Sequence, residues 1–337
     1  MFLGVDGGGT KTALCLVDSD GNLVAAEEAP SSYYFSAGIG SAGIGSAGIE
    51  LVQRVLKQGV DAVCSRAGIT PNDVTHAFFG LPGYGEASGD TAIIDAVPRS
   101  ILGHERYACD NDMVCGWAGS LGAVDGVNVI SGTGSMTYGE HHGRGVRVGG
   151  WGELFGDEGS AYWIAIQGLI AFAKMSDGRL PDGHLRAALS EHLDLPTDLD
   201  LVDVVLNRWN GGRSEIAALS PVVVRAANEG DAEAIRILAE AGRELADIVD
   251  VTTRRLKFDR DSVVPVSYSG GVFRSAAVLD QFRRALAERP YAFDLREPLY
   301  PPVVGAALYA AKLAGMPLTA AALTRLQASS VTPLSSL

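Results

Sequence analysis

The chain has 337 residues, of which 47 % are hydrophobic and 20 % charged, and its formal net charge is −13 at pH 7. This length suits two domains, and the acidic balance argues against nucleic acid or an anionic membrane surface as a partner. No apolar run reaches the roughly 20 residues of a membrane span, and no basic segment precedes a hydrophobic stretch as in a secretion signal. We therefore expect a cytoplasmic protein.

The first motif is a glycine turn between two expected strands, residues 2–5 and 13–17. It reads Asp6-Gly7-Gly8-Gly9-Thr10-Lys11. Consecutive glycines allow backbone at positive φ and let N–H groups approach a bulky anion. The motif is neither a Walker loop, since G-x-x-x-x-G-K-[ST] is missing, nor a dinucleotide fingerprint, since a strand follows the glycines. The residues expected to bind a nucleotide phosphate are Gly8, Gly9, Thr10 and Lys11.

Asp6 stands at the end of the first expected strand. We expect it to hold Mg²⁺ through water, because Mg²⁺ keeps much of its hydration shell in proteins. A plain β-hairpin with a glycine turn is the alternative interpretation of the whole motif.

After a third expected strand at residues 23–25, a pentapeptide that begins Ser-Ala-Gly-Ile occurs three times over residues 36–50. A five-residue period fits neither helix nor strand, so we expect a tolerant loop or a lid. Further along, apolar spacing predicts helices over residues 49–67, 91–102 and 113–121. Buried strands are expected at 77–81 and 105–109.

Asp112 is the expected catalytic base. It follows a strand and begins a helix, where a carboxylate can accept the proton of a sugar hydroxyl, which is a poor nucleophile at neutral pH. Asp110 is the alternative base. Either residue could instead only cap the helix that follows.

The strand–glycine turn–strand pattern occurs again, with expected strands at 127–130 and 136–138. The residues of this second turn that are expected to bind phosphate are Gly132, Thr133, Gly134 and Ser135. The repetition indicates a structural duplication into two α/β domains. A third glycine turn, at Gly270 and Gly271, follows an expected strand at 263–268, at the end of a strand where α/β folds bind ligands. Glycine turns beside carboxylates suggest phosphoryl transfer, which depends on positioning and charge neutralisation.

The loop at residues 149–159 combines glycines, an aromatic side chain and carboxylates, as a sugar site does. Its candidate contacts are Gly150, Trp151, Glu153, Asp157 and Glu158. Together with Asp112, these acids would crowd negative charge, which a cationic substrate amine would relieve. The alternative is a solvated loop that caps the expected helix at 160–174.

Two more helices are expected at residues 231–256 and 303–314. The four cysteines show no CxxC pairing and lie in apolar surroundings, which predicts buried free thiols; they are Cys15, Cys64, Cys109 and Cys115.

Taken in order, these motifs resemble the N-acetylglucosamine/glucosamine kinase group of the BadF/BadG/BcrA/BcrD-type ATPases, in the actin–hexokinase–Hsp70 superfamily. The resemblance covers nearly the whole chain. It implies an α/β fold of two ribonuclease-H-like (actin-like ATPase) domains flanking a central cleft, the use of ATP and Mg²⁺, and in many members a homodimer. The implied parts are a domain over 1–115 with the helix near 303–314 at the hinge, a domain over 116–326 with a helical insertion, and a flexible tail over 327–337.

The resemblance also implies adenosine contacts, from Ser214, Gly270, Gly271, Val272 and Ser275. It places Asp112 as the base, and Gly150, Trp151 and Asp157 on the sugar with Glu153 nearby.

Two segments depart from the N-acetylglucosamine kinase pattern, both on the sugar side. Residues 31–34 lack an expected asparagine, and residues 81–84 lack an expected Ser-Gly-Gly. Tyr33, Gly83 and Tyr84 thereby become candidate substrate contacts. With the crowded carboxylates, these departures favour D-glucosamine, phosphorylated on its 6-hydroxyl, over N-acetylglucosamine as the alternative.

Three other classes of protein share parts of this pattern. An iron–sulfur ATPase that activates a dehydratase would need paired cysteines, and a sugar-sensing repressor would need a helix-turn-helix for which Asp6 leaves no room. A non-catalytic sugar-binding module stays open.

Overall fold

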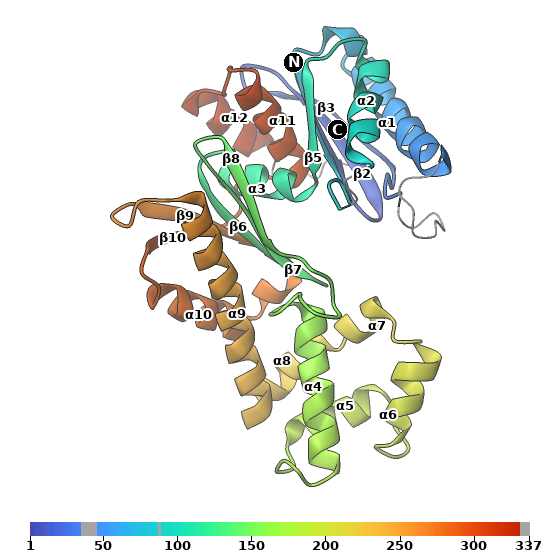
Figure 1. The fold of residues 1–337 in the computed structure, drawn as a ribbon, viewed down its shortest axis with the longest axis vertical. Coiled ribbons are helices and arrows are strands. Elements are labelled where there is room, and N and C mark those ends of the chain that lie inside the picture. The colour runs from blue at the N-terminus through green and yellow to red at the C-terminus, as the bar shows by residue number, and fades with distance from the viewer. Residues whose placement is uncertain (35–45, 87–88, 331–337) are drawn as a thin grey trace. The chain divides into compact units, whose positions relative to one another are not determined.

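The computed structural model describes residues 1–34, 46–86 and 89–330 (Figure 1). They form two compact units. The first combines Met1–Val124 with the C-terminal segment that begins at Glu297, and the second is Asp125–Arg296.

The first unit is built on a five-stranded sheet in the order β3-β2-β1-β4-β5. Its strands are β1 (Phe2–Gly7), β2 (Lys11–Val17), β3 (Leu23–Pro30), β4 (His76–Leu81) and β5 (Tyr107–Asn111). Strand β1 pairs antiparallel with β2 and parallel with β4. The helices are α1 (Ser46–Arg66), α2 (Thr91–Leu102), α3 (Met113–Leu121), α11 (Pro302–Leu313) and α12 (Ala320–Ser330), with a 3₁₀ turn at Pro71–Asp73. Helices α1 and α2 cover one face of the sheet and α11 the other (Figure 1).

The second unit repeats this topology. Its sheet has the order β8-β7-β6-β9-β10, in which β6 pairs antiparallel with β7 and parallel with β9. The strands are β6 (Gly126–Ser131), β7 (Ser135–His141), β8 (Arg144–Gly149), β9 (Val263–Ser269) and β10 (Ala292–Arg296). Each sheet therefore has its first strand in the middle, two antiparallel strands on one side and two parallel strands on the other. The predicted α/β class with two similarly built domains is confirmed.

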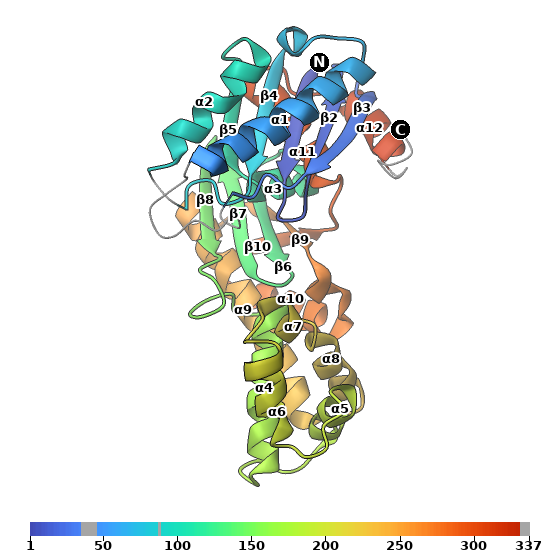
Figure 2. The ribbon, with the colours of Figure 1, turned by 90° about the vertical axis from the view of Figure 1, so that its right-hand side faces the viewer.

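The helices of the second unit lie mostly between β8 and β9 in the chain. They are α4 (Ala161–Ser176), α5 (His184–His192), α6 (Asp200–Val202), a π-helical segment (Asp203–Arg208), α7 (Arg213–Ala217), α8 (Ser220–Asn228) and α9 (Ala232–Leu256), followed after β9 by a 3₁₀ turn (Gly271–Arg274) and α10 (Ala276–Ala287). Helices α4 to α8 gather beyond one end of this unit's own sheet (Figure 2).

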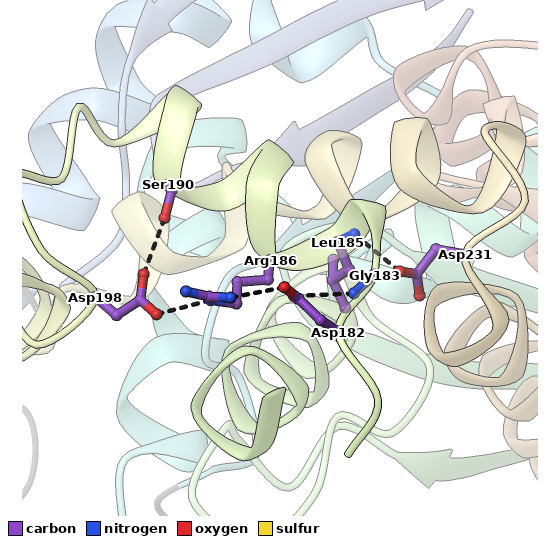
Figure 3. Close-up of polar contacts among 7 residues, drawn as sticks. All are labelled: Asp182, Gly183, Leu185, Arg186, Ser190, Asp198 and Asp231. Atoms are coloured by element: carbon purple, nitrogen blue, oxygen red, sulfur yellow. Dashed lines mark hydrogen bonds and ion pairs between the residues drawn. The ribbon is translucent and has the colours of Figure 1, made fainter. Parts of the chain in front are cut away.

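Asp231 ties this helical insertion together (Figure 3). Its Oδ2 accepts the Leu185 N–H at the start of α5, and its Oδ1 accepts an N–H from the first turn of α9, both at 2.9 Å. One buried carboxylate therefore caps two helices. Nearby, Arg186 bridges Asp182 at 2.8 Å and Asp198 at 2.7 Å.

The division between the units falls at 124/125, whereas the sequence led us to expect 115/116. The reason is that α3 packs against α11 through glycines. A Cβ added to Gly119 or Gly305 would lie within 3 Å of backbone atoms of the opposing segment. The segment from Glu297 thus completes the first unit, and α12 occupies the start of the expected tail, of which 331–337 lie outside the described residues.

The strands β8 and β10 and the helices α5 to α8, α10 and α12 were not individually expected. Of the pentapeptide repeat, only residues 46–50 lie in the described part, where they begin α1. All four cysteines are free, and Cys15, Cys64 and Cys115 are buried while Cys109 is half-buried. Among the described residues, no helix is both long and apolar enough to cross a bilayer.

Candidate active site

The first glycine turn joins β1 to β2, as predicted, but not for the predicted reason. None of Gly7, Gly8 and Gly9 lies at positive φ. Glycine is required at position 7 because an added Cβ would lie within 3 Å of Ser32 and Pro82. The turn is closed by the Gly8 N–H, which donates to the carbonyl of Lys11 at 2.8 Å.

The tip of this turn faces solvent. Gly9, Thr10 and Lys11 are exposed, and the Lys11 ammonium forms an ion pair with Glu28 on β3. The Ser31 hydroxyl donates to the carbonyl of Gly8 at 2.8 Å, which braces the turn from the end of β3. The exposed N–H groups and the Thr10 hydroxyl suit contacts with phosphate oxygens.

Behind the turn, Asp6 and Asp112 form an acidic pair. Burial first, and then the neighbouring Asp112 carboxylate, raise the pKa of Asp6 to about 7, although the Cys115 thiol and Lys11 act in the opposite direction. Glycine at position 80 lets the start of α3 pack closely against β4. A Cβ added to Gly80 would lie 3.2 Å from the Asp112 Cα and closer still to the Cys115 Sγ.

Two neighbouring carboxylates in a largely buried place repel one another, and a divalent cation relieves that repulsion. Oxygen ligands of this kind suit Mg²⁺. The residues present therefore fit the expected ion, with Asp6 as the group that would hold it.

Asp112 occupies the N-cap position of α3, yet its side chain does not cap the helix. The cap bond comes from Asn111, whose Oδ1 accepts the Met113 N–H at 3.2 Å. The alternative role for Asp112, as a helix cap, is therefore wrong, because its side chain forms no cap hydrogen bond. The alternative base, Asp110, instead accepts the N–H of Asn111 at 2.7 Å, and burial raises its pKa.

The candidate sugar contacts of the first unit are connected to Asn111, the residue before Asp112. Asn111 donates to the carbonyl of Tyr84 at 3.2 Å, and the Tyr84 hydroxyl donates to Asp95 at 2.8 Å. Gly83 accepts from the hydroxyl of Tyr34 at 3.1 Å. The 81–84 loop is thus fixed to β5 and to the segment after β3. Tyr33, in that segment, is half-buried.

In the second unit, the turn between β6 and β7 is held against the start of α4. The N–H of Ala161 donates to the carbonyl of Gly132 at 2.8 Å, and the Ser135 hydroxyl donates to the carbonyl of Glu158 at 2.6 Å. The Ser131 hydroxyl donates to the carbonyl of Gly159 at 2.9 Å. The sequence motifs at 131–135 and 149–159 therefore form one continuous structure.

Arg213, at the start of α7, forms ion pairs with two acids of that structure. Its guanidinium lies 2.5 Å from Asp157 and 3.3 Å from Glu153. Asp157 is only 3 % exposed and has a φ of 57°, so its carboxylate is held inward beside the glycine turn. A Cβ on Gly134 would lie within 3 Å of both Arg213 and Asp157, which explains glycine there. Sequence reasoning missed Arg213 because no local pattern links it to Asp157.

The loop beyond the turn presents apolar side chains to solvent. Trp151 is 70 % exposed, Leu154 is 87 % exposed and Phe155 is 76 % exposed. Gly150 has a φ of 69°, which an L side chain rarely adopts, and its carbonyl accepts from Arg147. An exposed aromatic beside carboxylates suits a sugar ring, as expected for Trp151. Glu158 is half-buried. Burial raises the pKa of Glu244, and the nearby charge of Glu158 raises it further.

The third glycine turn packs on the second. Gly270 has a φ of 101°, and a Cβ there would lie within 3 Å of the Ser131 carbonyl. Val272 is buried and Ser275 half-buried at the start of α10. Ser214 is exposed next to Arg213, so the structure brings the expected phosphate and adenosine residues of this unit to one region.

The chain resembles known proteins along nearly its whole length. A family described as the BadF/BadG/BcrA/BcrD ATPase family matches residues 3–310. An N-acetyl-D-glucosamine kinase of Dictyostelium discoideum is 30 % identical over 92 % of this chain and 97 % of its own. An N-acetylmuramic acid/N-acetylglucosamine kinase of Clostridium acetobutylicum is 32 % identical over 84 % and 89 %. A solved structure of a candidate N-acetylglucosamine kinase from Chromobacterium violaceum is 25 % identical, with a TM-score of 0.65 over 91 % and 98 % of the two chains.

Proposed function

The chain belongs to the BadF/BadG/BcrA/BcrD ATPase family, and on this premise we propose that it is a kinase that transfers the γ-phosphoryl group of ATP to the 6-hydroxyl of N-acetylglucosamine. The observation that carries the proposal is the acidic pair of Asp6 and Asp112 behind the first glycine turn. It combines a candidate base with a candidate metal-binding group, as phosphoryl transfer to a hydroxyl requires.

The N-acetylated sugar replaces glucosamine as the preferred acceptor. The preference for glucosamine depended on uncompensated carboxylates that a substrate amine would balance. Arg213 already offsets one of these negative charges, since its guanidinium lies against Asp157 and Glu153, so the second unit has less need of a cationic substrate. The names of the two curated relatives, both N-acetylglucosamine kinases, support the same choice.

In the proposed reaction, Asp112 accepts the proton of the sugar 6-hydroxyl while that oxygen bonds to the γ-phosphorus and the bond to the β,γ-bridging oxygen breaks. In the first unit, backbone N–H groups at the tip of the glycine turn and the Thr10 hydroxyl are the donors for phosphate oxygens. In the second unit, the donors are backbone N–H groups of its own turn and the Thr133 hydroxyl, since the Ser135 hydroxyl already donates to the carbonyl of Glu158. Mg²⁺ held by Asp6 would supply neutralisation of the phosphate charge. Trp151 provides an apolar face for the sugar ring.

The test is a coupled ADP-release assay with N-acetylglucosamine, N-acetylmuramic acid, glucosamine and glucose. We expect the highest kcat/KM with N-acetylglucosamine, and no turnover of its 6-deoxy analogue. A higher kcat/KM with glucosamine would overturn the choice of acceptor. The absence of turnover with every sugar would overturn the kinase proposal.

A further inference from the structure

Two histidines and an aspartate converge at one end of the second unit's sheet. Asp125 directly precedes β6, His141 ends β7, and His142 lies in the turn to β8. One ligand atom from each lies within 4.8 Å of the others. None of these residues belongs to the glycine turns or to the 149–159 loop.

The turn explains why adjacent histidines meet. Consecutive side chains of a strand point to opposite faces of a sheet. Here His142 has a φ of 52° and Gly143 a φ of 74°, so the chain reverses in left-handed conformation at the end of β7. The reversal brings the two imidazole rings to 4.0 Å between centroids.

His141 has a hydrogen-bond partner of the kind that metal-binding histidines have. Its Nδ1 lies 3.1 Å from the carbonyl oxygen of Leu256, at the end of α9. A carbonyl oxygen can only accept, so Nδ1 carries the hydrogen, and in the neutral ring Nε2 bears the lone pair. A backbone carbonyl on the far nitrogen is a common second partner of such histidines. Phe258 stacks on the same ring, with 3.9 Å between centroids and 20° between planes.

Asp125 is positioned by the same turn. Its Oδ2 accepts the backbone N–H of His142 at 2.9 Å, and ligating carboxylates commonly carry such a hydrogen bond. The Nδ1 of His142 lies 3.8 Å from that oxygen, too far for a hydrogen bond. Two ligands of a tetrahedral zinc ion, with bonds of about 2.0–2.1 Å, stand about 3.3 Å apart. A small rotation of the exposed His142 side chain closes the difference for this pair, and the third ligand atom lies within 4.8 Å of both.

We propose that Asp125, His141 and His142 bind a divalent transition-metal ion, with Zn²⁺ as the probe. Two imidazoles and one carboxylate favour Zn²⁺ over Mg²⁺, which prefers oxygen ligands, so this site is separate from the proposed one at Asp6. The ion would fasten the β7–β8 turn to the start of β6. Because it binds the folded state, it would stabilise the second unit.

The test is a calorimetric titration of the full-length, tag-free protein with Zn²⁺ at pH 7.5. We expect one saturable site, and at least tenfold weaker binding in His141→Phe and in His142→Asn. Phenylalanine keeps the stacking on Phe258, and asparagine tolerates left-handed backbone. His184→Ala, on α5, is the matched control and should bind as the unaltered protein does.

Co²⁺ gives a second measurement, since a tetrahedrally bound Co²⁺ ion absorbs visible light. This absorption should be lost in the same two variants. The proposal is overturned if no saturable site is found, or if one site persists with unchanged affinity in both variants. Circular dichroism of each variant establishes that it is folded. None of these measurements depends on kinase activity, so failure here is distinct from failure of the proposed function.

Discussion

The two glycine turns have the same strand–turn–strand structure but opposite electrostatic surroundings. Behind the first turn, Asp6 and Asp112 lie together, and burial and mutual repulsion raise the pKa of Asp6 to about 7. Beside the second turn, the buried Asp157 is paired with Arg213 at 2.5 Å. The first unit therefore places two carboxylates close enough to repel each other, whereas the second places an arginine against its buried aspartate.

Two turns with the same backbone structure can therefore have different functions, because different charged side chains surround them. A site with excess negative charge gains from a cation and can take up a proton. A balanced site can bind neutral hydroxyls and phosphate without a charge penalty of its own. Variants of Asp112, Asp6 and Arg213 test this division, in decreasing order of expected effect, and a variant of Asp231 is a control outside both turns.

Asp112→Asn should cause the largest loss. An asparagine cannot accept the hydroxyl proton, so kcat should fall by roughly 10²–10⁴-fold with little change in the KM for sugar. Steady-state ADP release measures this. Asp110→Asn is the control and should retain most of the activity; the reverse result would make Asp110 the base.

Asp6→Asn should separate stability from activity. The folded pKa of Asp6, about 7, lies above the usual value of 3.8, so ionisation costs the folded state. Below pH 3.8, Asp6 is protonated in both states and does not lower the free energy of unfolding. As the pH rises, its ionisation lowers the free energy of unfolding, by up to about 4 kcal/mol at pH 8. The variant should be less active with Mg²⁺, because Asp6 would hold the ion, though the loss should be smaller than in Asp112→Asn. It should nevertheless be more stable than the unaltered protein at pH 8.

Urea unfolding in EDTA at pH 5 and pH 8 measures the Asp6 effect. The exposed Asp20→Asn is a control that should show no gain at pH 8. A variant of Asp6 that is less stable at pH 8 would show that the acidic pair is not repulsive.

Arg213→Met should disturb the balanced turn. It leaves Asp157 buried without its partner, which costs 3–5 kcal/mol in a fully buried pair. Because the Arg213 side chain is 42 % exposed, solvent screens the remaining charge and reduces this cost. We expect the free energy of unfolding to fall by about 2 kcal/mol and the KM for sugar to rise. Adding Asp157→Asn should restore much of the stability but not the KM. Equal losses in single and double variants would contradict the pairing.

Asp231→Ala should have the smallest effect and leave the comparison untouched. Loss of the two cap bonds to α5 and α9 should lower stability by about 1–2 kcal/mol, measured by thermal unfolding. Both kcat and KM should stay unchanged, since Asp231 lies outside both turns. A fall in kcat would show that the helical insertion influences the site.

Local signals predicted what lies close together in the chain. Alternating glycines and apolar runs located both turns, and the position of Asp112 after β5 followed from its sequence neighbours. The reasons for the glycines did not follow, because Gly7 and Gly134 are required by side chains that approach from other segments. The Arg213–Asp157 pair joins α7 to a distant loop, and no periodicity reports such a contact. The strand order of the second sheet could not be predicted, because strands β8 and β10 were not expected from the sequence.

The packing of α11 on β1 has a consequence for the order of events during synthesis. Gly4 lies directly under α11, where a Cβ would lie within 3 Å of the backbone of Val303 and Ala307. Strand β1 is therefore synthesised well before the helix α11 that covers it. The second unit is one uninterrupted stretch and can fold while the chain is still being made. We expect the second unit of the nascent chain to be protected from protease before the first unit is.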